Sequence, residues 1–212
     1  MLSDAMELVF LSDTHGRHRE VKIPGGDVLI HAGDFSVWFG TMEELEDFND
    51  FLGQLPHEHK IVVAGNHDFC FERTNAEARS VLTNAHYLQD ESLEIDGIKF
   101  YGSPWQPEFL DLAFNLPRGK PLRHKWDMIP PDTDVLITHG PPHGIGDKTF
   151  DGRHVGCEEL LLRVNQVKPR VHVFGHVHEG RGRFEIEDTI FLNAATDRDG
   201  RSPFRLSLTK AI

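Results

Sequence analysis

The chain has 212 residues, of which 39% are hydrophobic and 26% are charged, a balance typical of a folded globular protein and not of a disordered one. It carries 22 basic against 34 acidic side chains, a formal net charge of −12, which disfavours long nucleic acids and anionic membranes as partners because both require a basic face. Its longest strictly apolar runs, Leu8 to Leu11 and Ile61 to Ala64, are far shorter than the roughly 18 residues expected of a transmembrane helix.

Short apolar segments recur along the chain, and each is followed by polar residues or a glycine. We expect buried strands at residues 8–11, 28–30, 61–64, 135–137 and 171–174. Near-continuous apolar strands suit a sheet that is covered on both faces.

Two segments between these strands have helical periodicity. The segment from Thr41 to Leu55 begins with the spacing of a capping box, a threonine followed three residues later by Glu44. The segment from Cys157 to Val167 repeats the periodicity and is stopped by Pro169. Strand, helix and strand in alternation predict an α/β fold with parallel crossovers.

The second half contains two segments of different character. Residues 184–187, 189–192 and 204–208 are short alternating strands with tight connections, which predict an antiparallel meander at the carboxy-terminal end. Residues 102–131 are rich in proline and aromatic residues, and we expect an ordered loop there. With no internal repeat and no linker, residues 1–212 are expected to form a single domain.

Histidine is the unusual residue of this chain, with 14 copies against two cysteines, which points to imidazole or metal chemistry. Metal-competent side chains follow five of the apolar strands: Asp13 with His15, Asp34, Asn66 with His67, His139, and His176 with His178. Ligands bind at the carboxyl ends of the strands in open α/β sheets, so we expect these residues to converge at one sheet edge. Each motif alone could be a turn or a helix cap, but together they favour a binuclear metal site.

These motifs, in this order, resemble the signature of the calcineurin-like metallophosphoesterases. The signature elements D-x-H, G-D, G-N-H-D, T-H-G and G-H-x-H stand at residues 13–15, 33–34, 65–68, 138–140 and 175–178. More narrowly, the chain resembles the metallophosphoesterase-domain-containing proteins of vertebrate brain and their bacterial relatives through residues 114–119, 139–142, 155–157 and 172–175. The resemblance implies a four-layer α-β-β-α sandwich with mixed sheets.

The resemblance also implies a role for each motif residue. One divalent ion would be bound by Asp13, His15, Asp34 and His178, and the second by Asp34, Asn66, His139 and His176, with Asp34 bridging the two. His67 would act on the substrate as a general acid, and Asp68 would either orient the His67 imidazole or stabilise a turn. Nitrogen and oxygen ligands without a thiolate suit Mn²⁺, Fe²⁺, Co²⁺ or Zn²⁺, and the resemblance favours Mn²⁺.

Two divalent ions would leave a local positive charge in an acidic chain and so attract a small phosphoester. We expect a phosphodiesterase acting on nucleotide-like or cyclic nucleotide esters, by in-line attack of a metal-bridging hydroxide. The residues after Gly33-Asp34 lack the Asp-Arg-Gly continuation of serine/threonine protein phosphatases.

Residues of the long loop are candidates for substrate binding. Trp105 and Phe109 could stack on a nucleobase, or they could pack the loop onto the sheet. Asn115 and Arg118 are the candidates for contacts with phosphate or sugar. Trp38 is a further candidate wall, for which packing is the favoured interpretation.

Two other functions stay open at this level. One is a nucleotide-binding sensor with weak turnover, because some vertebrate relatives have glycine at the position of His176. The other is a phosphomonoesterase, which the sequence does not separate from a diesterase. With two cysteines and no secretory signal in Met1 to Glu7, the expected location is the cytoplasm.

Overall fold

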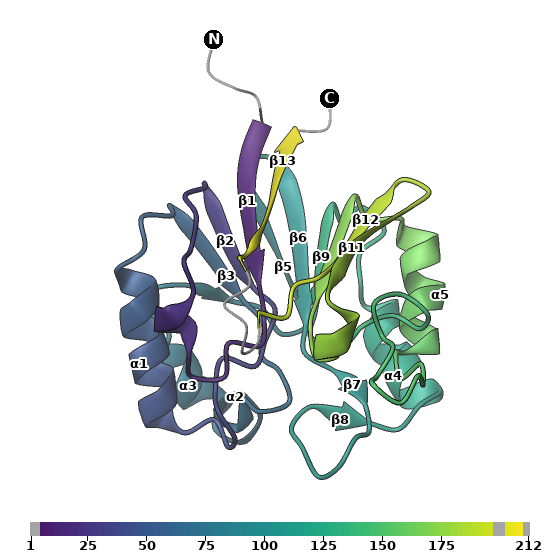
Figure 1. Cartoon of the computed structure of the whole chain (residues 1–212), viewed down its shortest axis with the longest axis horizontal. Coiled ribbons are helices and arrows are strands. Elements are labelled where there is room, and N and C mark those ends of the chain that lie inside the picture. The colour runs from purple at the N-terminus through teal and green to yellow at the C-terminus, as the bar shows by residue number, and fades with distance from the viewer. Residues whose placement is uncertain (1–4, 197–201, 210–212) are drawn as a thin grey trace.

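The computed structural model describes residues 5–196 and 202–209. Two β-sheets pack face to face, and helices cover the outer face of each, so the fold is the expected four-layer α-β-β-α sandwich (Figure 1). The expected strands and both expected helices are present. Within the described ranges, no helix is long and apolar enough to cross a bilayer.

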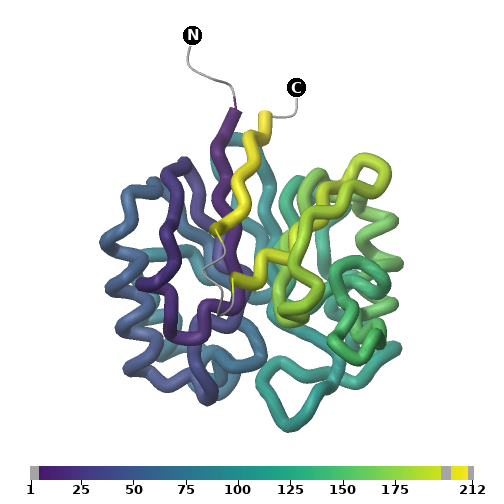
Figure 2. The backbone as a smooth tube through the Cα atoms, viewed as in Figure 1, coloured from purple at the N-terminus to yellow at the C-terminus, as the bar shows by residue number. Residues whose placement is uncertain are grey.

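The first sheet has five strands in the order β13-β1-β2-β3-β4. Its parallel part consists of β1 (Ala5–Leu11), β2 (Val28–His31), β3 (His59–Val62) and β4 (His86–Tyr87). The last strand, β13 (Phe204–Thr209), runs antiparallel to β1. Figure 2 shows it in yellow, returning beside the first strand in purple.

The second sheet has six strands in the order β11-β12-β10-β9-β6-β5. Its central strands are parallel: β6 (Ile98–Ser103), β9 (Val135–Thr138), β10 (Val171–Phe174) and β12 (Thr189–Asn193). The edge strands β5 (Glu91–Ile95) and β11 (Gly182–Ile186) pair antiparallel to their neighbours.

The predicted carboxy-terminal meander is wrong beyond its first hairpin. Only β11 and β12 form an antiparallel pair, β12 also pairs in parallel with β10, and β13 leaves for the other sheet. Alternating polarity predicted strands correctly, but it carries no information about which neighbour each strand pairs with.

Five α-helices lie on the outer faces of the sheets: α1 (Met42–Gly53), α2 (Phe69–Arg73), α3 (Asn75–Val81), α4 (Lys120–Asp127) and α5 (Glu158–Val167). Two 3₁₀ turns, η1 (His18–Glu20) and η2 (His178–Gly180), complete the described helical elements. The expected capping box of α1 is formed, because Thr41 Oγ1 accepts from Glu44 N at 3.3 Å and Thr41 N donates to Glu44 Oε2 at 2.9 Å.

Alternation along β1 explains why the strands are apolar on both faces. Leu8 and Phe10 point into the core between the two sheets, whereas Val9 and Leu11 point to the core under α1. A third core lies between the second sheet and helices α4 and α5. Three apolar interfaces therefore hold the four layers together.

The proline-rich stretch 102–131 is ordered, as expected, and it contains more regular structure than a loop. Strands β7 (Gln106–Pro107) and β8 (Asn115–Leu116) pair with each other, and α4 follows them. The segment between β7 and β8 lies at the end of the molecule where the strands β2 and β9 finish (Figure 1).

Candidate metal centre

The candidate ligands lie in the loops that follow β1, β2, β3, β9 and β10, as the sequence predicts, but these strands belong to two sheets instead of one. The loops bond directly to one another: Asp13 N donates to Gly33 O, His15 N to Asp34 O, and Gly175 N to His139 O. Convergence is therefore confirmed, and the expectation of a single sheet edge is corrected. The carboxyl ends of the parallel strands in both sheets face the same cleft.

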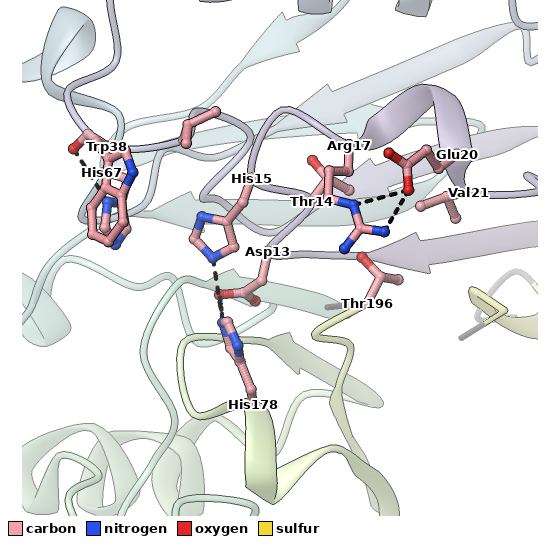
Figure 3. Close-up of a pocket in the computed structure, with 11 residues that line it drawn as sticks. Asp13, Thr14, His15, Arg17, Glu20, Val21, Trp38, His67, His178 and Thr196 are labelled. Atoms are coloured by element: carbon pink, nitrogen blue, oxygen red, sulfur yellow. Dashed lines mark hydrogen bonds and ion pairs between the residues drawn. The ribbon is translucent and has the colours of Figure 1, made fainter. Parts of the chain in front are cut away.

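One group of ligand atoms comes from Asp13, His15 and His178, all within 4.8 Å of one another. His178 Nε2 lies 3.2 Å from Asp13 Oδ1 and 3.4 Å from His15 Nε2. Figure 3 shows the three side chains pointing toward a common centre.

A second group lies beside the first and comes from Asp13, Asp34 and His139, again within 4.8 Å. His139 Nε2 is 3.4 Å from Asp34 Oδ2, and Asn66 Oδ1 lies 2.9 Å from His139 Nε2 and 2.7 Å from His176 Nδ1. Asp34 Oδ2 is also 3.9 Å from His15 Nε2, so this carboxylate faces both groups.

The hydrogen-bonding roles of the imidazoles fit a metal. His139 Nδ1 lies 2.9 Å from the carbonyl oxygen of Ala32, which can only accept, so Nδ1 carries the hydrogen and Nε2 faces the oxygens of Asn66 and Asp34. His15 is arranged in the same way, with Nδ1 on the carbonyl of Ser36 at 3.1 Å and Nε2 toward His178. The Nε2 atoms of His139 and His15 thus face oxygen or nitrogen atoms across the cluster, an arrangement that suits a proton or a metal ion between them.

The charges of the cluster also suit a cation. Burial opposes ionisation of Asp13 and Asp34, yet neighbouring histidines lower the pKa of both carboxyls, that of Asp34 to about 2. Desolvation acts against protonation of His139, but Asp34 raises the pKa of His139 to about 9. Burial lowers the pKa of His176 to about 4. A divalent ion would displace the proton from His139 and take over its role as the counter-charge.

Two signature glycines allow the ligand loops to approach so closely. A Cβ on Gly175 would lie 1.9 Å from Asp13 Oδ2, and one on Gly65 would lie 2.2 Å from Asp34 Oδ1. Four of the candidate ligands, Asp13, His15, Asp34 and His176, have φ between 42° and 67°. This left-handed backbone costs on the order of 1–3 kcal/mol per residue and is concentrated at functional sites.

His67 belongs to a third group of possible ligand atoms, with His15 and Asp34, and presents one nitrogen to the cleft. Its Nδ1 lies 3.2 Å from the carbonyl oxygen of Trp38 and is therefore the donor, while Nε2 is 3.9 Å from Asp34 Oδ2. The loop backbone also holds this residue, because His67 N donates to Asp34 Oδ1 at 2.8 Å.

Asp68 has the second of the two roles that the sequence left open. Its carboxylate accepts from the backbone N–H groups of Gly65, Asp34 and Ser36 at 2.7, 2.8 and 3.0 Å. The partner of the His67 ring is the Trp38 carbonyl, which favours the turn-stabilising alternative over the one in which Asp68 orients the imidazole. Burial, with the nearby Asp34 carboxylate, raises the pKa of Asp68 to about 7. Asp68 is a positioning residue that joins the β2 and β3 loops.

The sequence profile described as calcineurin-like phosphoesterase matches residues 6–180, a span that includes every ligand loop described above. The chain belongs to the calcineurin-like phosphoesterase family. Members of this family are phosphoester hydrolases that use divalent metals.

Curated relatives agree with this assignment. The chain is 45% identical over 212 aligned positions to metallophosphoesterase domain-containing protein 1 of Homo sapiens and, to the same extent, of Mus musculus. Each alignment covers 88% of this phosphoesterase chain but 65% of the relative, so the chain spans about two thirds of the length of those proteins.

Solved structures share the fold. One matches with a TM-score of 0.69 at 20% identity, over 89% of this chain and 90% of the other. The phosphopantetheinyl hydrolase PptH of Mycobacterium tuberculosis matches with a TM-score of 0.62 at 16% identity, over 92% and 90% of the two chains. At these identities the likeness concerns the phosphoesterase fold alone.

The predicted substrate contacts of this phosphoesterase are not at its cleft. Arg118 donates to the carbonyl oxygens of Gly156 and Val155 at 2.8 and 2.7 Å and pairs with Glu158, so it holds the segment that enters α5. Trp105 donates from Nε1 to Asp90 at 2.9 Å and packs against two core clusters. Long-range partners satisfy both side chains outside the two groups of residues that line the cleft, so their contact with substrate stays a prediction that this arrangement does not favour.

Asn115 reaches the cleft only indirectly. Its Nδ2 donates to the carbonyl oxygens of Phe109 and Leu110 at 3.1 and 3.0 Å. Those two residues line the cleft, so Asn115 shapes the loop that carries them, and a direct contact with substrate stays a prediction.

The cleft over the ligands has two lobes. The narrow lobe, about 410 Å³, lies over Asp13 and includes Arg17, whose guanidinium binds Glu20 (Figure 3). The wide lobe, about 710 Å³, lies over Asp34 and Asn66 and is walled by apolar side chains: Trp38, Phe39, Phe109, Leu110 and Leu112. Trp38 lines both lobes and Phe109 the wide one, and both are mostly exposed, which favours a cleft wall over packing for these two residues.

Proposed function

We propose that residues 1–212 form one domain and that this domain is a binuclear metal-dependent phosphohydrolase that cleaves small phosphodiesters. The observation that carries the proposal is the pair of adjoining ligand groups that meet at the Asp34 carboxylate, 3.4 Å from His139 Nε2 and 3.9 Å from His15 Nε2. The family supports the reaction class.

The proposed ligand sets are those that the family resemblance implies, and the close approach of these side chains supports them. Asp13, His15, Asp34 and His178 would hold one ion, and Asp34, Asn66, His139 and His176 the other. We propose Mn²⁺ for activity in vitro, with Fe²⁺, Co²⁺ and Zn²⁺ also compatible with nitrogen and oxygen donors. When bound, a pair of divalent ions supplies an activated water and charge neutralisation for an in-line displacement at phosphorus.

His67 is the proposed proton donor to the leaving group. Its Nδ1–H is held by the Trp38 carbonyl, so Nε2 is the nitrogen that takes up and releases a proton in the cleft. The loops joined by Asp68 keep the ring in place without a contact to the substrate.

Two features support a diester and a catalyst over the alternatives. The two lobes share His15, Trp38, His67 and His178, so a phosphorus atom there has room for a substituent on either side. His176, with Nδ1 2.7 Å from Asn66 Oδ1, completes the second ligand set, which supports turnover over a nucleotide sensor. Free, buried Cys70 and Cys157 are consistent with the proposed cytoplasmic location.

The test measures metals and turnover on one preparation. Protein stripped with a chelator and reloaded with Mn²⁺ is expected to bind two ions per chain by mass spectrometry and to hydrolyse bis-p-nitrophenyl phosphate faster than p-nitrophenyl phosphate. A screen of cyclic nucleotides then narrows the substrate. Metal-loaded protein that binds nucleotides but hydrolyses neither ester would contradict the proposal and favour the sensor function.

A further inference from the structure

The apolar side chains around the cleft are exposed in a way that folding does not explain. Trp38 is 66% exposed, Phe109 55% and Leu110 75%. Of the nine large hydrophobic residues exposed in the described part of the chain, five line the two lobes: Val37, Trp38, Phe39, Phe109 and Leu110. Exposed apolar surface gathered around a concave site marks a place where a ligand binds.

The two aromatic walls come from opposite halves of the sandwich. Trp38 packs against His67 after β3 of the first sheet, with ring centroids 5.7 Å apart, and Phe109 packs against His176 after β10 of the second sheet, at 6.2 Å. The planes of each pair meet at 68° and 81°. Because neither contact is a parallel stack, each aromatic ring keeps a face for a further planar group.

Hydrogen bonds from other side chains fix the backbone of both walls before any ligand binds. The Trp38 carbonyl accepts from His67 Nδ1, and Val37 N donates to Glu44 Oε1 at 2.9 Å. On the other side, Asn115 bonds to the carbonyls of Phe109 and Leu110. Backbone positions that are already fixed reduce the entropy lost when a ligand is clamped.

The charged residues that line the wide lobe argue against an anionic group in it. Apart from the candidate ligands and His67, Glu179 is the one ionisable residue among those described along its wall, and neither lysine nor arginine lines it. A second phosphate would find no counter-charge there, and the apolar side chains of the wall favour an uncharged group over a cation.

We propose that the wide lobe is a subsite for an uncharged planar ring carried by the phosphoester, held between Trp38 and Phe109, which thereby determine specificity. The inference rests on the proposed function for the position of the phosphorus. It also implies that esters with further phosphates on the ring side are poor substrates.

Binding of phosphonates tests the subsite without turnover. Phenylphosphonate and methylphosphonate differ by the ring alone, and their C–P bonds resist hydrolysis. Calorimetry with Mn²⁺-loaded protein is expected to give at least about 10-fold tighter binding of phenylphosphonate, equivalent to about 1.4 kcal/mol. Thymidine 5′-monophosphate, compared with 2-deoxyribose 5-phosphate, places the ring at the distance of a nucleobase.

Variants assign the effect to the walls. For each ligand pair, the measured quantity is the Kd of the ligand without the ring divided by the Kd of the ligand with it. Trp38→Ala and Phe109→Ala are expected to reduce this ratio toward one, and Phe109→Tyr is expected to preserve it. The matched control is Phe150→Ala, which removes a 93% exposed aromatic ring that lines neither lobe. If the ratio of Kd values is near one for both ligand pairs in the unmodified protein, the subsite is refuted. It is also refuted if Trp38→Ala and Phe109→Ala leave the ratio unchanged.

The result is separable from the catalytic proposal. Ring-dependent binding by a protein that hydrolyses no phosphoester would support the subsite and refute the phosphohydrolase. Hydrolysis without ring dependence would do the reverse.

Discussion

The floor and the rim of the cleft are built from opposite kinds of residue. On the floor, Asp13, Asp34 and His139 are almost completely buried and bonded to one another or to the backbone. On the rim, Trp38 and Phe109 are mostly exposed. The buried charged side chains of the floor are stabilised by partners in the rest of the fold. The exposed apolar side chains of the rim would be buried by a bound ligand. Mutations should therefore affect chemistry at the floor and selectivity at the rim.

The largest effect is expected from Asp34→Asn. Its carboxylate faces both ligand groups, so removing the charge weakens both ion sites together. We expect kcat on bis-p-nitrophenyl phosphate to fall by at least about 10³-fold, since each tenfold corresponds to about 1.4 kcal/mol and such ions supply several kcal/mol. Asp151→Asn, at an exposed carboxylate outside both lobes, is the control. Unchanged metal content and kcat in the Asp34 variant would refute its bridging position.

His67→Gln separates proton transfer from metal binding. We expect kcat to fall by about 10²- to 10⁴-fold, the usual contribution of a positioned acid, while the metal content stays at the unmodified level. Steady-state kinetics and metal analysis on one sample check both. A loss of metal would instead assign His67 to the ligand set.

His176→Gly tests the second ligand group alone. The fold should persist, because the carboxylate contact at this position comes from His176 N, a backbone group that glycine retains. Turnover is expected to drop by about 10- to 100-fold or more, and metal content to fall toward one ion per chain. Circular dichroism and metal analysis provide the readouts, and equal activity would contradict the ligand assignment.

The smallest effect is expected from Arg118→Ala, outside the cleft. Its bonds to the Gly156 and Val155 carbonyls and its half-exposed ion pair with Glu158 contribute about 1–2 kcal/mol to the free energy of unfolding. A modest fall in Tm with an unchanged KM is the expected outcome. A tenfold rise in KM at constant Tm would restore Arg118 to substrate binding.

The loop contacts show where sequence reasoning failed. Trp105 and Arg118 were plausible cleft residues by their chemistry, but Asp90 and Glu158, far away in the chain, bind them elsewhere. Trp38 was expected to pack, yet the chain around it turns its indole outward over His67. The apolar residues 37–39 were the sequence feature that could have predicted this wall. A run of apolar residues does not by itself show, however, whether the side chains are buried or exposed.

Residue order alone was enough to predict the layers of the fold and the candidate metal ligands. Strand ends and the polar residues behind them are local features, and parallel strands carry such residues to one end of a sheet by geometry. The pairing of β13 with β1 and the outward turn of Phe109 were decided only in the folded chain. Both depend on contacts between residues distant in sequence. No local pattern determines which of several apolar segments a strand or side chain contacts in the folded chain.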